Sequence, residues 1–280
     1  MKVVLFDAMN LIHRSRNSFS KGEHALTYSF FRSFKPLAEK FNADLAYFVL
    51  EGKPAHRSGE YSQYKSNRPA QPSSFWRQCG EILETMKSLP VVQIKHPDYE
   101  CDDVIANLAK HHCDSGNEVI IVSFDSDFIQ VFDNMNPDLV KIYHPIKKVF
   151  IENPDYIYLD WKALRGDVSD NIPGIKGVGD KTATKIIKDR ALMEKTLADP
   201  QKKMIFDRNR SLIQFHWFDD LSNDLQDSGS EVVYPDVSFD AVRSSFAGMN
   251  FDSMLSDKYW TKFVAAFESL ADGAINDKCR

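Results

Sequence analysis

The sequence has no long apolar run. Its longest uninterrupted stretches of apolar residues, such as residues 45–50 and 119–122, are far shorter than the roughly 18 to 20 residues that a helix needs to cross a bilayer. At the N-terminus only four apolar residues separate Lys2 from Asp7, whereas the apolar part of a secretory signal needs about 7 to 15. We therefore expect a buried strand at the N-terminus, no membrane contact and a cytoplasmic protein.

Cysteine is scarce, with four residues in a chain of 280: Cys79, Cys101, Cys113 and Cys279. No two of them have the CxxC spacing, and no paired histidines accompany them, so the sequence indicates neither a zinc site nor a disulfide framework. We expect reduced thiols. Glycine and proline, at 12 residues each, are too few for a collagen-like or disordered chain, and the hydrophobic content of 43% is that of a folded globular protein.

An excess of positive charge is also lacking, because 35 basic residues face 40 acidic ones and leave a formal charge of −5. Nucleic-acid binders usually carry a net basic field, so this number at first argues against one. However, residues 219–240 hold seven acids and no Lys or Arg, and without them the rest of the chain is at +2. We expect this acidic stretch to be an exposed linker or irregular loop.

Short apolar runs alternate with longer amphipathic stretches over the first 150 residues. The runs predict strands at residues 3–6, 45–50, 91–94 and 119–123, and the stretches predict helices at 24–41, 73–88 and 101–112. This alternation is typical of an α/β fold in which helices flank a mostly parallel central sheet.

The pattern becomes helical after residue 151. Asn153 and Pro154 indicate a turn, residues 156–165 and 180–190 read as helices, and a glycine-rich loop separates them. We therefore expect an α/β domain over residues 1–153 and a helical subdomain over residues 154–280.

Carboxylates recur at the ends of the predicted strands and at the starts of helices and turns. They are Asp7, Glu51, Glu100, Asp102, Asp103, Asp125, Asp127, Asp167 and Asp170. In open α/β sheets ligands bind at the carboxyl ends of the strands, so these groups should meet in one cleft, where their mutual repulsion requires cations. Oxygen ligands with no histidine or cysteine nearby favour Mg²⁺ or Mn²⁺ over zinc.

Two such ions about 4 Å apart could activate a water and stabilise the leaving oxygen of a phosphodiester. Glu100 and Asp103, three residues apart at a helix start, can face the same way, while Asp102 points elsewhere. The alternative is that each acidic pair only caps a helix and interacts with its dipole. Capping does not explain Asp7 and Glu51, which follow strands.

A glycine-rich loop leads into the helix predicted at 180–190. Its backbone amides and the helix N-terminus can hold a phosphate of a DNA backbone, and nearby lysines add attraction that does not depend on sequence. The residues expected to face DNA here are Gly174, Lys176, Gly177, Gly179, Lys181, Thr182 and Lys185. The alternative is an ordinary turn between two helices.

Residues 52–72 form a polar segment with a charge of about +3, which we expect to be a mobile loop or a short helix. Tyr61 and Tyr64 are interleaved with Lys65 and Arg68, a pattern suited to stacking bases and pairing phosphates of a single strand. A solvated charged helix is the alternative interpretation.

Together these motifs resemble the 5′-nuclease superfamily of flap endonucleases and bacterial and phage 5′→3′ exonucleases. The matching segments are residues 4–10, the Tyr-Lys-Ser-Asn-Arg of 64–68, the Tyr-Glu-Cys-Asp-Asp of 99–103 against the family's Glu-Ala-Asp-Asp, the Asp-Ser-Asp of 125–127, and residues 166–174 with the Gly-x-Gly hairpin. One departure is Glu51-Gly52, where the family has Asp-Gly.

The resemblance implies a helical arch at about 52–75 and a helix-hairpin-helix element at about 167–190, which in the family often binds K⁺. It implies that Lys65 and Arg68, beside Tyr64, contact the scissile phosphate. For the metals it implies one Mg²⁺ held by Asp7, Glu100, Asp102, Asp103 and Asp125, with Glu51 nearby, and a second held by Asp127, Asp167 and Asp170, with Mn²⁺ as a substitute.

The function that the resemblance implies is a divalent-metal-dependent 5′-nuclease without a polymerase domain, acting in replication or repair inside a bacterial or phage-infected cell. Its substrates would be DNA with 5′ flaps or ends and the RNA of DNA–RNA hybrids. It would act as a monomer, with a single-strand-binding or replication protein as partner. The alternatives are a PIN-like ribonuclease, which lacks the hairpin and the arch, and a catalytically silent structure-specific DNA-binding protein.

Overall fold

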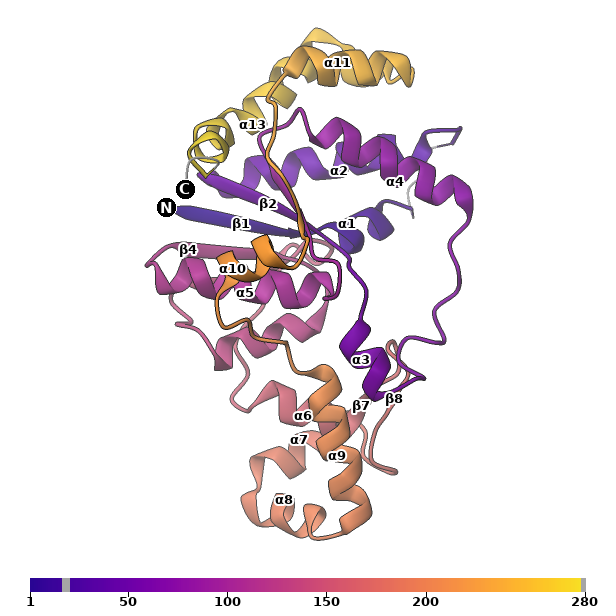
Figure 1. Ribbon diagram of the computed structural model, residues 1–280, viewed down its shortest axis with the longest axis vertical. Helices are drawn as coiled ribbons and strands as arrows, with labels where there is room; N and C mark the ends of the chain where they lie inside the picture. Colours follow the sequence, from indigo (N-terminus) through magenta and orange to yellow (C-terminus); the bar gives the residue numbers. More distant parts are fainter. Residues whose placement is uncertain (17–20, 278–280) are drawn as a thin grey trace.

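A seven-stranded sheet organises the chain, for which the computed structural model describes residues 1–16 and 21–277 (Figure 1). The strands are β1 (Lys2–Asp7), β2 (Leu45–Leu50), β3 (Val92–Lys95), β4 (Glu118–Val122), β5 (Val140–His144), β6 (Val149–Phe150) and β9 (Glu231–Val233). Their order is β6-β5-β4-β1-β2-β3-β9, and pairing is parallel except at the two edge strands. The predicted α/β class with a mostly parallel sheet is confirmed.

Helices cover both faces of the sheet. One face carries α1 (Ala8–Ser15), α2 (Ala25–Phe41) and α4 (Ser73–Met86), and the other carries α5 (Cys101–Asp114) and the 3₁₀ helix η1 (Ser126–Asp133). Side chains of a strand alternate between faces, so β1 sends Val4 and Phe6 into one core and Val3 and Leu5 into the other.

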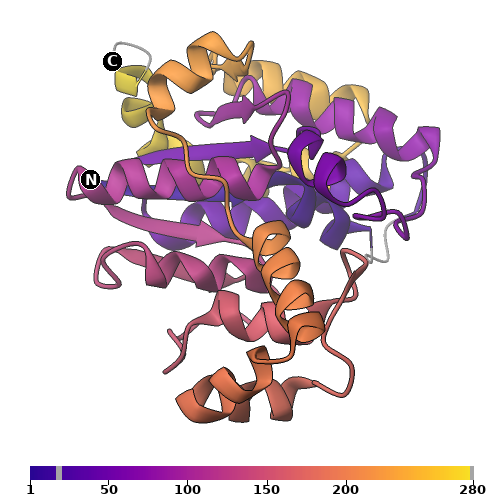
Figure 2. The same cartoon turned by 60° about the horizontal axis from the view of Figure 1, so that its bottom comes forward.

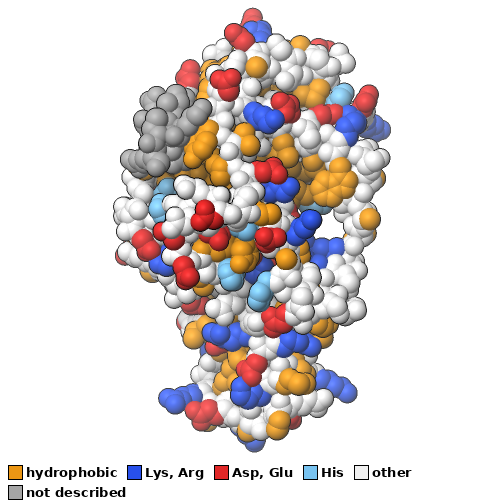
Figure 3. Space-filling model, viewed as in Figure 1, with side chains coloured by type: hydrophobic (Ala, Val, Ile, Leu, Met, Phe, Trp, Pro, Cys, Tyr) orange, Lys and Arg blue, Asp and Glu red, His pale blue; other side chains and the backbone are white. Residues whose placement is uncertain are grey.

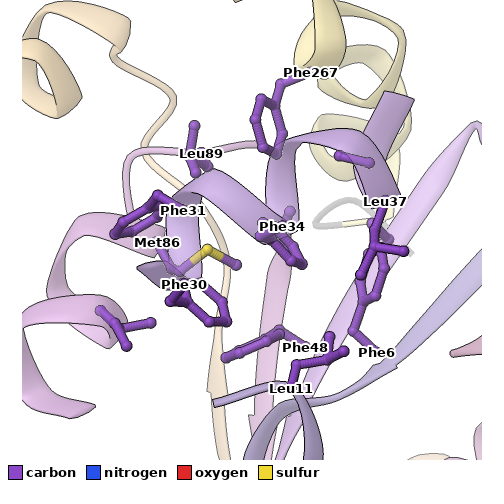
Figure 4. Packing of buried hydrophobic residues seen from close by; sticks show 14 of the residues in the cluster. Phe6, Leu11, Phe30, Phe31, Phe34, Leu37, Phe48, Met86, Leu89 and Phe267 are labelled. Carbon is purple, nitrogen blue, oxygen red and sulfur yellow. The ribbon is translucent and has the colours of Figure 1, made fainter. Parts of the chain in front are cut away.

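The first of these cores is rich in phenylalanine (Figure 4). The ring of Phe34 meets that of Phe6 edge to face at 4.8 Å and stacks on Phe30 at 5.2 Å. Such ring pairs add to the hydrophobic gain of burial and fix the side chains in one arrangement. The strand that ends in Asp7 is therefore held rigidly.

The C-terminal part of the chain returns to the sheet. Strand β9 pairs with β3 and forms that edge of the sheet, and Phe246, Phe263 and Phe267 are fully buried in the phenylalanine-rich core. The helices that follow the small subdomain are α10 (Leu221–Asp227), α11 (Phe239–Gly248), α12 (Asp252–Leu255) and α13 (Asp257–Asp277). The expectation of one helical subdomain over 154–280 does not match this arrangement, and the expectation of an irregular loop at 219–240 is wrong for α10 and β9.

A small helical subdomain lies below the carboxyl edge of the sheet (Figure 2). It contains α6 (Tyr158–Arg165), the two-stranded hairpin of β7 (Gly166–Asp167) and β8 (Ile172–Pro173), α7 (Asp180–Lys188), α8 (Arg190–Leu197) and α9 (Pro200–Ile213). It has its own apolar core, in which Ala163, Leu164, Ile175 and Ala183 are buried. Of the element expected around 167–190, the structure has the hairpin of β7 and β8 and the helix α7, while α6 precedes this range.

Residues 52–72, which we call the arch, connect the sheet to α4 across the front of the site. Only α3 (Ala55–Glu60) is helical, and the rest of the segment consists of turns and irregular backbone. In the space-filling view an opening remains between this segment and the body of the molecule (Figure 3).

Among the described residues, no helix combines the length and the apolar character that crossing a membrane requires.

Candidate functional site

Three parallel strands bring acidic side chains to one edge of the sheet. Asp7 ends β1, Glu51 follows β2, and Asp125 lies just after β4. Gly52 follows Glu51, and its backbone lies against the loop after β3. A Cβ at residue 52 would lie 2.0 Å from the carbonyl oxygen of His96. Only glycine permits this close approach of the two loops.

Asp7, Cys101 and Asp102 form what we call the first cluster, in which one potential ligand atom from each residue lies within 4.8 Å of the others. Asp7 caps α1 by accepting from the backbone of Asn10, and it accepts from Ser123 Oγ at 2.8 Å. Burial raises the pKa of Asp7 to about 7, and nearby carboxylates add to the rise. Burial also raises the pKa of Asp102, helped by the charges of Asp125 and Asp7. The expectation that no cysteine lies near the carboxylates is wrong.

Asp127, Asp167 and Asp170 form the second cluster, with the same mutual distance limit. Lys162 lies among them: its Nζ pairs with Asp127 and lies 2.7 Å from Asp167. Burial tends to raise the pKa of Asp167, but Lys162 and Ser169 outweigh burial and lower the pKa below its usual range. At Asp127 burial dominates and raises the pKa to about 7.

Arg57 of the arch binds two of the expected metal ligands. Its Nη1 lies 2.7 Å from Glu100 Oε2, and both terminal nitrogens bind Asp103, at 2.6 and 2.7 Å. Glu100 and Asp103 thus do face the same way. Asp103 is fully buried and also accepts from the backbone of His216, so both of its oxygens are engaged in holding the arch and the residues after α9 onto α5. The structure gives Asp103 this anchoring role, and the metal contact that the sequence suggested stays a prediction.

Asp125 connects the two clusters electrostatically. Its side chain accepts from the backbone of Asp127 at 2.9 Å and caps η1, as the alternative capping interpretation requires. Its charge nevertheless contributes to the raised pKa of both Asp7 and Asp127. Asp125 therefore both caps η1 and contributes its charge to the acidic site.

The Tyr-Lys-Ser-Asn-Arg segment of the arch closes over the site. Tyr64 Oη lies 2.8 Å from Glu100 Oε2, and Lys65 pairs with Glu100 and lies 3.9 Å from Glu51. Arg68 pairs with Asp170 at 2.5 Å, and the backbone of Lys65 donates to the backbone of Asp170. The arch therefore contacts both the carboxyl edge of the sheet and the second cluster.

The glycine-rich hairpin presents a basic surface that is separate from the acidic site. Gly177 has a φ of +83°, and Gly179 caps α7. The side chains of the expected DNA-facing residues Lys176, Lys181, Thr182 and Lys185 are exposed. Gly174 differs, because a Cβ there would lie 1.9 Å from the carbonyl oxygen of Arg165. Its role is to let β8 pack against the end of α6.

Sequence reasoning missed three residues of this site: Arg57, Lys162 and Cys101. Nothing in the basic segment distinguishes Arg57 from its neighbours. Lys162 could have been noticed as a lone cation between Trp161 and the apolar Ala-Leu pair of a predicted helix. Cys101 replaces the alanine of the family's Glu-Ala-Asp-Asp element, and that departure was visible in the sequence.

Comparisons with known proteins identify the family of this chain. The chain matches the N-terminal resolvase-like domain of 5′-3′ exonucleases over residues 2–161 and their C-terminal SAM fold over residues 154–226. It is 33% identical over 210 residues to the thermostable DNA polymerase I of Thermus thermophilus, covering 69% of this chain and 24% of the polymerase. It is 35% identical over 187 residues to a 5′-3′ exonuclease of Aquifex aeolicus, covering 62% of this chain and 63% of that protein.

Solved structures share the fold. A T5 5′-exonuclease with bound zinc aligns with a TM-score of 0.59 at 18% identity, over 96% of this chain and all of the other. The catalytic core of Rad2 in complex with DNA aligns with a TM-score of 0.55 at 15% identity, over 94% of this chain and 92% of the other. The chain spans about a quarter of the length of the polymerases that it matches. The match of the N-terminal model to more than half of the residues shows that the chain belongs to the 5′-3′ exonuclease family.

Proposed function

We propose that the chain is a divalent-metal-dependent 5′-nuclease that hydrolyses DNA phosphodiesters where single and double strands meet. The observation that carries this proposal is the pair of acidic clusters at the carboxyl edge of the sheet, beneath an arch whose cations pair with Glu100, beside the first cluster, and with Asp170 of the second. Family membership supports it, as do the metal ions and DNA present in structures of T5 D15 flap endonuclease.

The donor set of the site fits divalent cations. Asp7 and Asp127 resist ionisation, with pKa values raised to about 7, because burial removes water from the charged forms, and at Asp127 this outweighs the pairing with Lys162. Bound cations would stabilise the ionised forms. We assign one Mg²⁺ to Asp7 and Asp102, with Glu51, Glu100 and Asp125 around them, and the other to the second cluster. When bound, the two ions would supply water activation and stabilisation of the leaving oxygen.

The arch would orient the phosphate. Lys65 and Arg68 now pair with carboxylates, and metal ions at those carboxylates would weaken these pairs by competing for the same oxygens. The freed ammonium and guanidinium groups would then bind the oxygens of the scissile phosphate and stabilise the charge that develops during cleavage. Tyr64, donating to Glu100, positions this carboxylate.

The hairpin would hold the duplex. Exposed Lys176, Lys181 and Lys185 would attract the DNA backbone, and the amides at the start of α7 would hold a phosphate, with K⁺ bound at the hairpin. A single strand would pass through the opening under the arch. We extend the proposal to the RNA of DNA–RNA hybrids, to a monomer as the active form, and to a single-strand-binding or replication protein as partner.

The test is an assay of a 5′-labelled flap duplex with Mg²⁺ and with EDTA. We expect cleavage near the junction only with Mg²⁺, and the product length will distinguish release of flaps from stepwise release of nucleotides. Binding without cleavage in both conditions would favour the silent DNA-binding alternative. Preferential cleavage of unpaired RNA, with flap DNA left intact, would favour the PIN-like ribonuclease.

A further inference from the structure

A thiol lies inside the first cluster. Cys101 Sγ is 3.3 Å from Asp102 Oδ1 and 3.7 Å from Asp7 Oδ1, and the residue is only 4% exposed. The backbone N–H of Cys101 donates to Glu51 Oε2 at 3.3 Å. Cys79 and Cys113 are buried as well, and Cys101 shares an apolar core with Cys113, but among the described residues neither Cys79 nor Cys113 lies in a group of potential metal ligands. Among the described cysteines, Cys101 alone lies with two carboxylates, those of Asp7 and the neighbouring Asp102, in a group of metal-ligand geometry.

The chemistry of this donor set differs from that of carboxylates alone. A thiol carries one hydrogen, so it can donate to only one of the two carboxylates that it faces, and the other contact gains nothing from it. A cation at this point would satisfy both carboxylates and the sulfur together. Thiolate ligands favour ions such as Zn²⁺ and Co²⁺, whereas Mg²⁺ requires oxygen ligands.

We propose that Cys101 is a ligand in the first metal site and gives this chain a site that binds thiophilic divalent ions more tightly than Mg²⁺. The inference rests on the proposed function and concerns which ion the first cluster prefers. It follows from this chain's own residues, because the family pattern has alanine at this position. When an ion binds, the bond from Sγ to the ion forms as the S–H bond breaks, and the proton leaves to solvent with no change in oxidation state.

The test follows the sulfur-to-metal bond by spectroscopy and needs no activity measurement. Titration of the full chain with Co²⁺ or Cd²⁺ should produce an ultraviolet charge-transfer band of a metal–thiolate bond, and Mg²⁺ should reverse it only in large excess. Cys101→Ala should lose the band and bind Cd²⁺ at least about tenfold more weakly, the smallest loss typical of removing even an outer-shell partner. Its affinity for Mg²⁺ should change by less than the affinity for Cd²⁺.

Two matched variants complete the test. Cys113→Ala removes a buried thiol outside the cluster and should keep the band, while Cys101→Ser keeps a small polar group and should lose the band. Circular dichroism checks that each variant is folded. A wild-type protein without the band, or a band that survives in Cys101→Ala, would overturn the proposal.

Measurements with Mg²⁺ separate this inference from the proposed function. Calorimetric Mg²⁺ binding and flap cleavage are measured on the same preparations. If Mg²⁺ binds and supports cleavage while no thiolate band appears, the role of Cys101 is wrong and the nuclease assignment stands. If folded wild-type protein shows neither Mg²⁺ binding nor cleavage, the nuclease assignment itself is wrong.

Discussion

The two carboxylate clusters differ in how their charges are balanced before any metal binds. The second cluster contains the buried ammonium of Lys162, and the pKa of Asp167 is lowered accordingly. In the first cluster the third member is a thiol, and the pKa values of Asp7 and Asp102 are both raised. The second cluster is thus partly neutralised by the protein itself, whereas the first depends on protons or a bound cation.

The clusters also differ in what they connect. Asp7 and Asp102 both belong to the sheet domain. Asp127 lies in the first turn of η1 on the sheet, but Asp167 and Asp170 lie in the β7–β8 hairpin of the helical subdomain, where the arch also docks. The built-in lysine therefore stabilises a junction between two parts of the fold, whereas the first cluster joins elements of the sheet domain only.

The largest expected effect is on catalysis, where both clusters should matter. We predict that Asp127→Asn lowers kcat on a flap substrate by about 10²- to 10³-fold, the loss typical of removing one preorganised stabilising group. DNA binding, measured by fluorescence anisotropy, should change little because the hairpin lysines are intact. Asp133→Asn, at the other end of η1 and outside both clusters, serves as the control. Full activity of Asp127→Asn would contradict the site assignment.

The next effect is on stability, where the clusters should differ. Lys162→Met leaves Asp127 and Asp167 without their buried counter-ion, so we expect a loss of about 3 to 5 kcal/mol of unfolding free energy in EDTA. Mg²⁺ should restore part of this loss by taking over the neutralisation. Lys110→Met, which removes an exposed ion pair with Asp114, should change stability by about 0.5 kcal/mol or less. Both variants are measured by denaturant unfolding. If Lys162→Met and Lys110→Met lose the same unfolding free energy, Lys162 does not balance the charge of the second cluster.

A third effect is on the pH dependence of stability. Folded Asp7 holds its proton up to about pH 7, against 3.8 for its ordinary pKa, so the metal-free protein should lose stability as pH rises from about 4 to about 7. Asp167 has the opposite shift, and its contribution should be lost only as pH falls below about 4. Thermal unfolding in EDTA at a series of pH values measures both the loss of stability toward neutral pH and the loss below about pH 4.

Substitution separates these two contributions. Asp7→Asn should flatten the decline toward neutral pH, and Asp167→Asn should leave that decline in place. Saturating Mg²⁺ should abolish the decline in the wild-type protein, because the bound ions replace the protons. A decline that is equally steep with Mg²⁺ and with EDTA would mean that the raised pKa values are unrelated to cation binding.

The smallest effect on stability is expected at Arg68, the exposed arch cation that pairs with Asp170 of the second cluster. The Arg68 side chain is 51% exposed, so its pair with Asp170 is screened by solvent, and Arg68→Gln should cost less than about 1 kcal/mol. Flap cleavage should nevertheless fall, since the proposed role of Arg68 is toward the phosphate. Unfolding in urea and cleavage kinetics on one preparation test this contrast, and a variant that loses stability as Lys162→Met does would refute it.

The positions of the acidic residues could be predicted because they follow from local pattern and sheet geometry. Asp7, Glu51 and Asp125 each follow an apolar run, and parallel pairing of β1, β2 and β4 brings such positions to one edge. The grouping of Asp127 with Asp167 and Asp170 followed the family motifs, and the structure brings the same three residues together.

The counter-ions could not be predicted because their partners are distant in sequence. Arg57 and Asp103 are 46 residues apart, and Lys162 and Asp127 are 35 apart, so no local pattern relates them. Strand β9 was missed for a related reason. It has three residues amid an acidic stretch, and its pairing with β3, in which Val232 lies opposite Ile94, depends on a sheet that is already formed.

The return of the chain through β9 means that the helical subdomain is inserted into the sheet domain and not appended to it. The backbone enters the subdomain after β6 and leaves it after α9, so two covalent connections tether it. A body tethered at two points can rotate about the line between them but cannot swing freely in other directions. Opening of the site would then be a one-axis movement, with the hairpin and its lysines travelling together along a single arc.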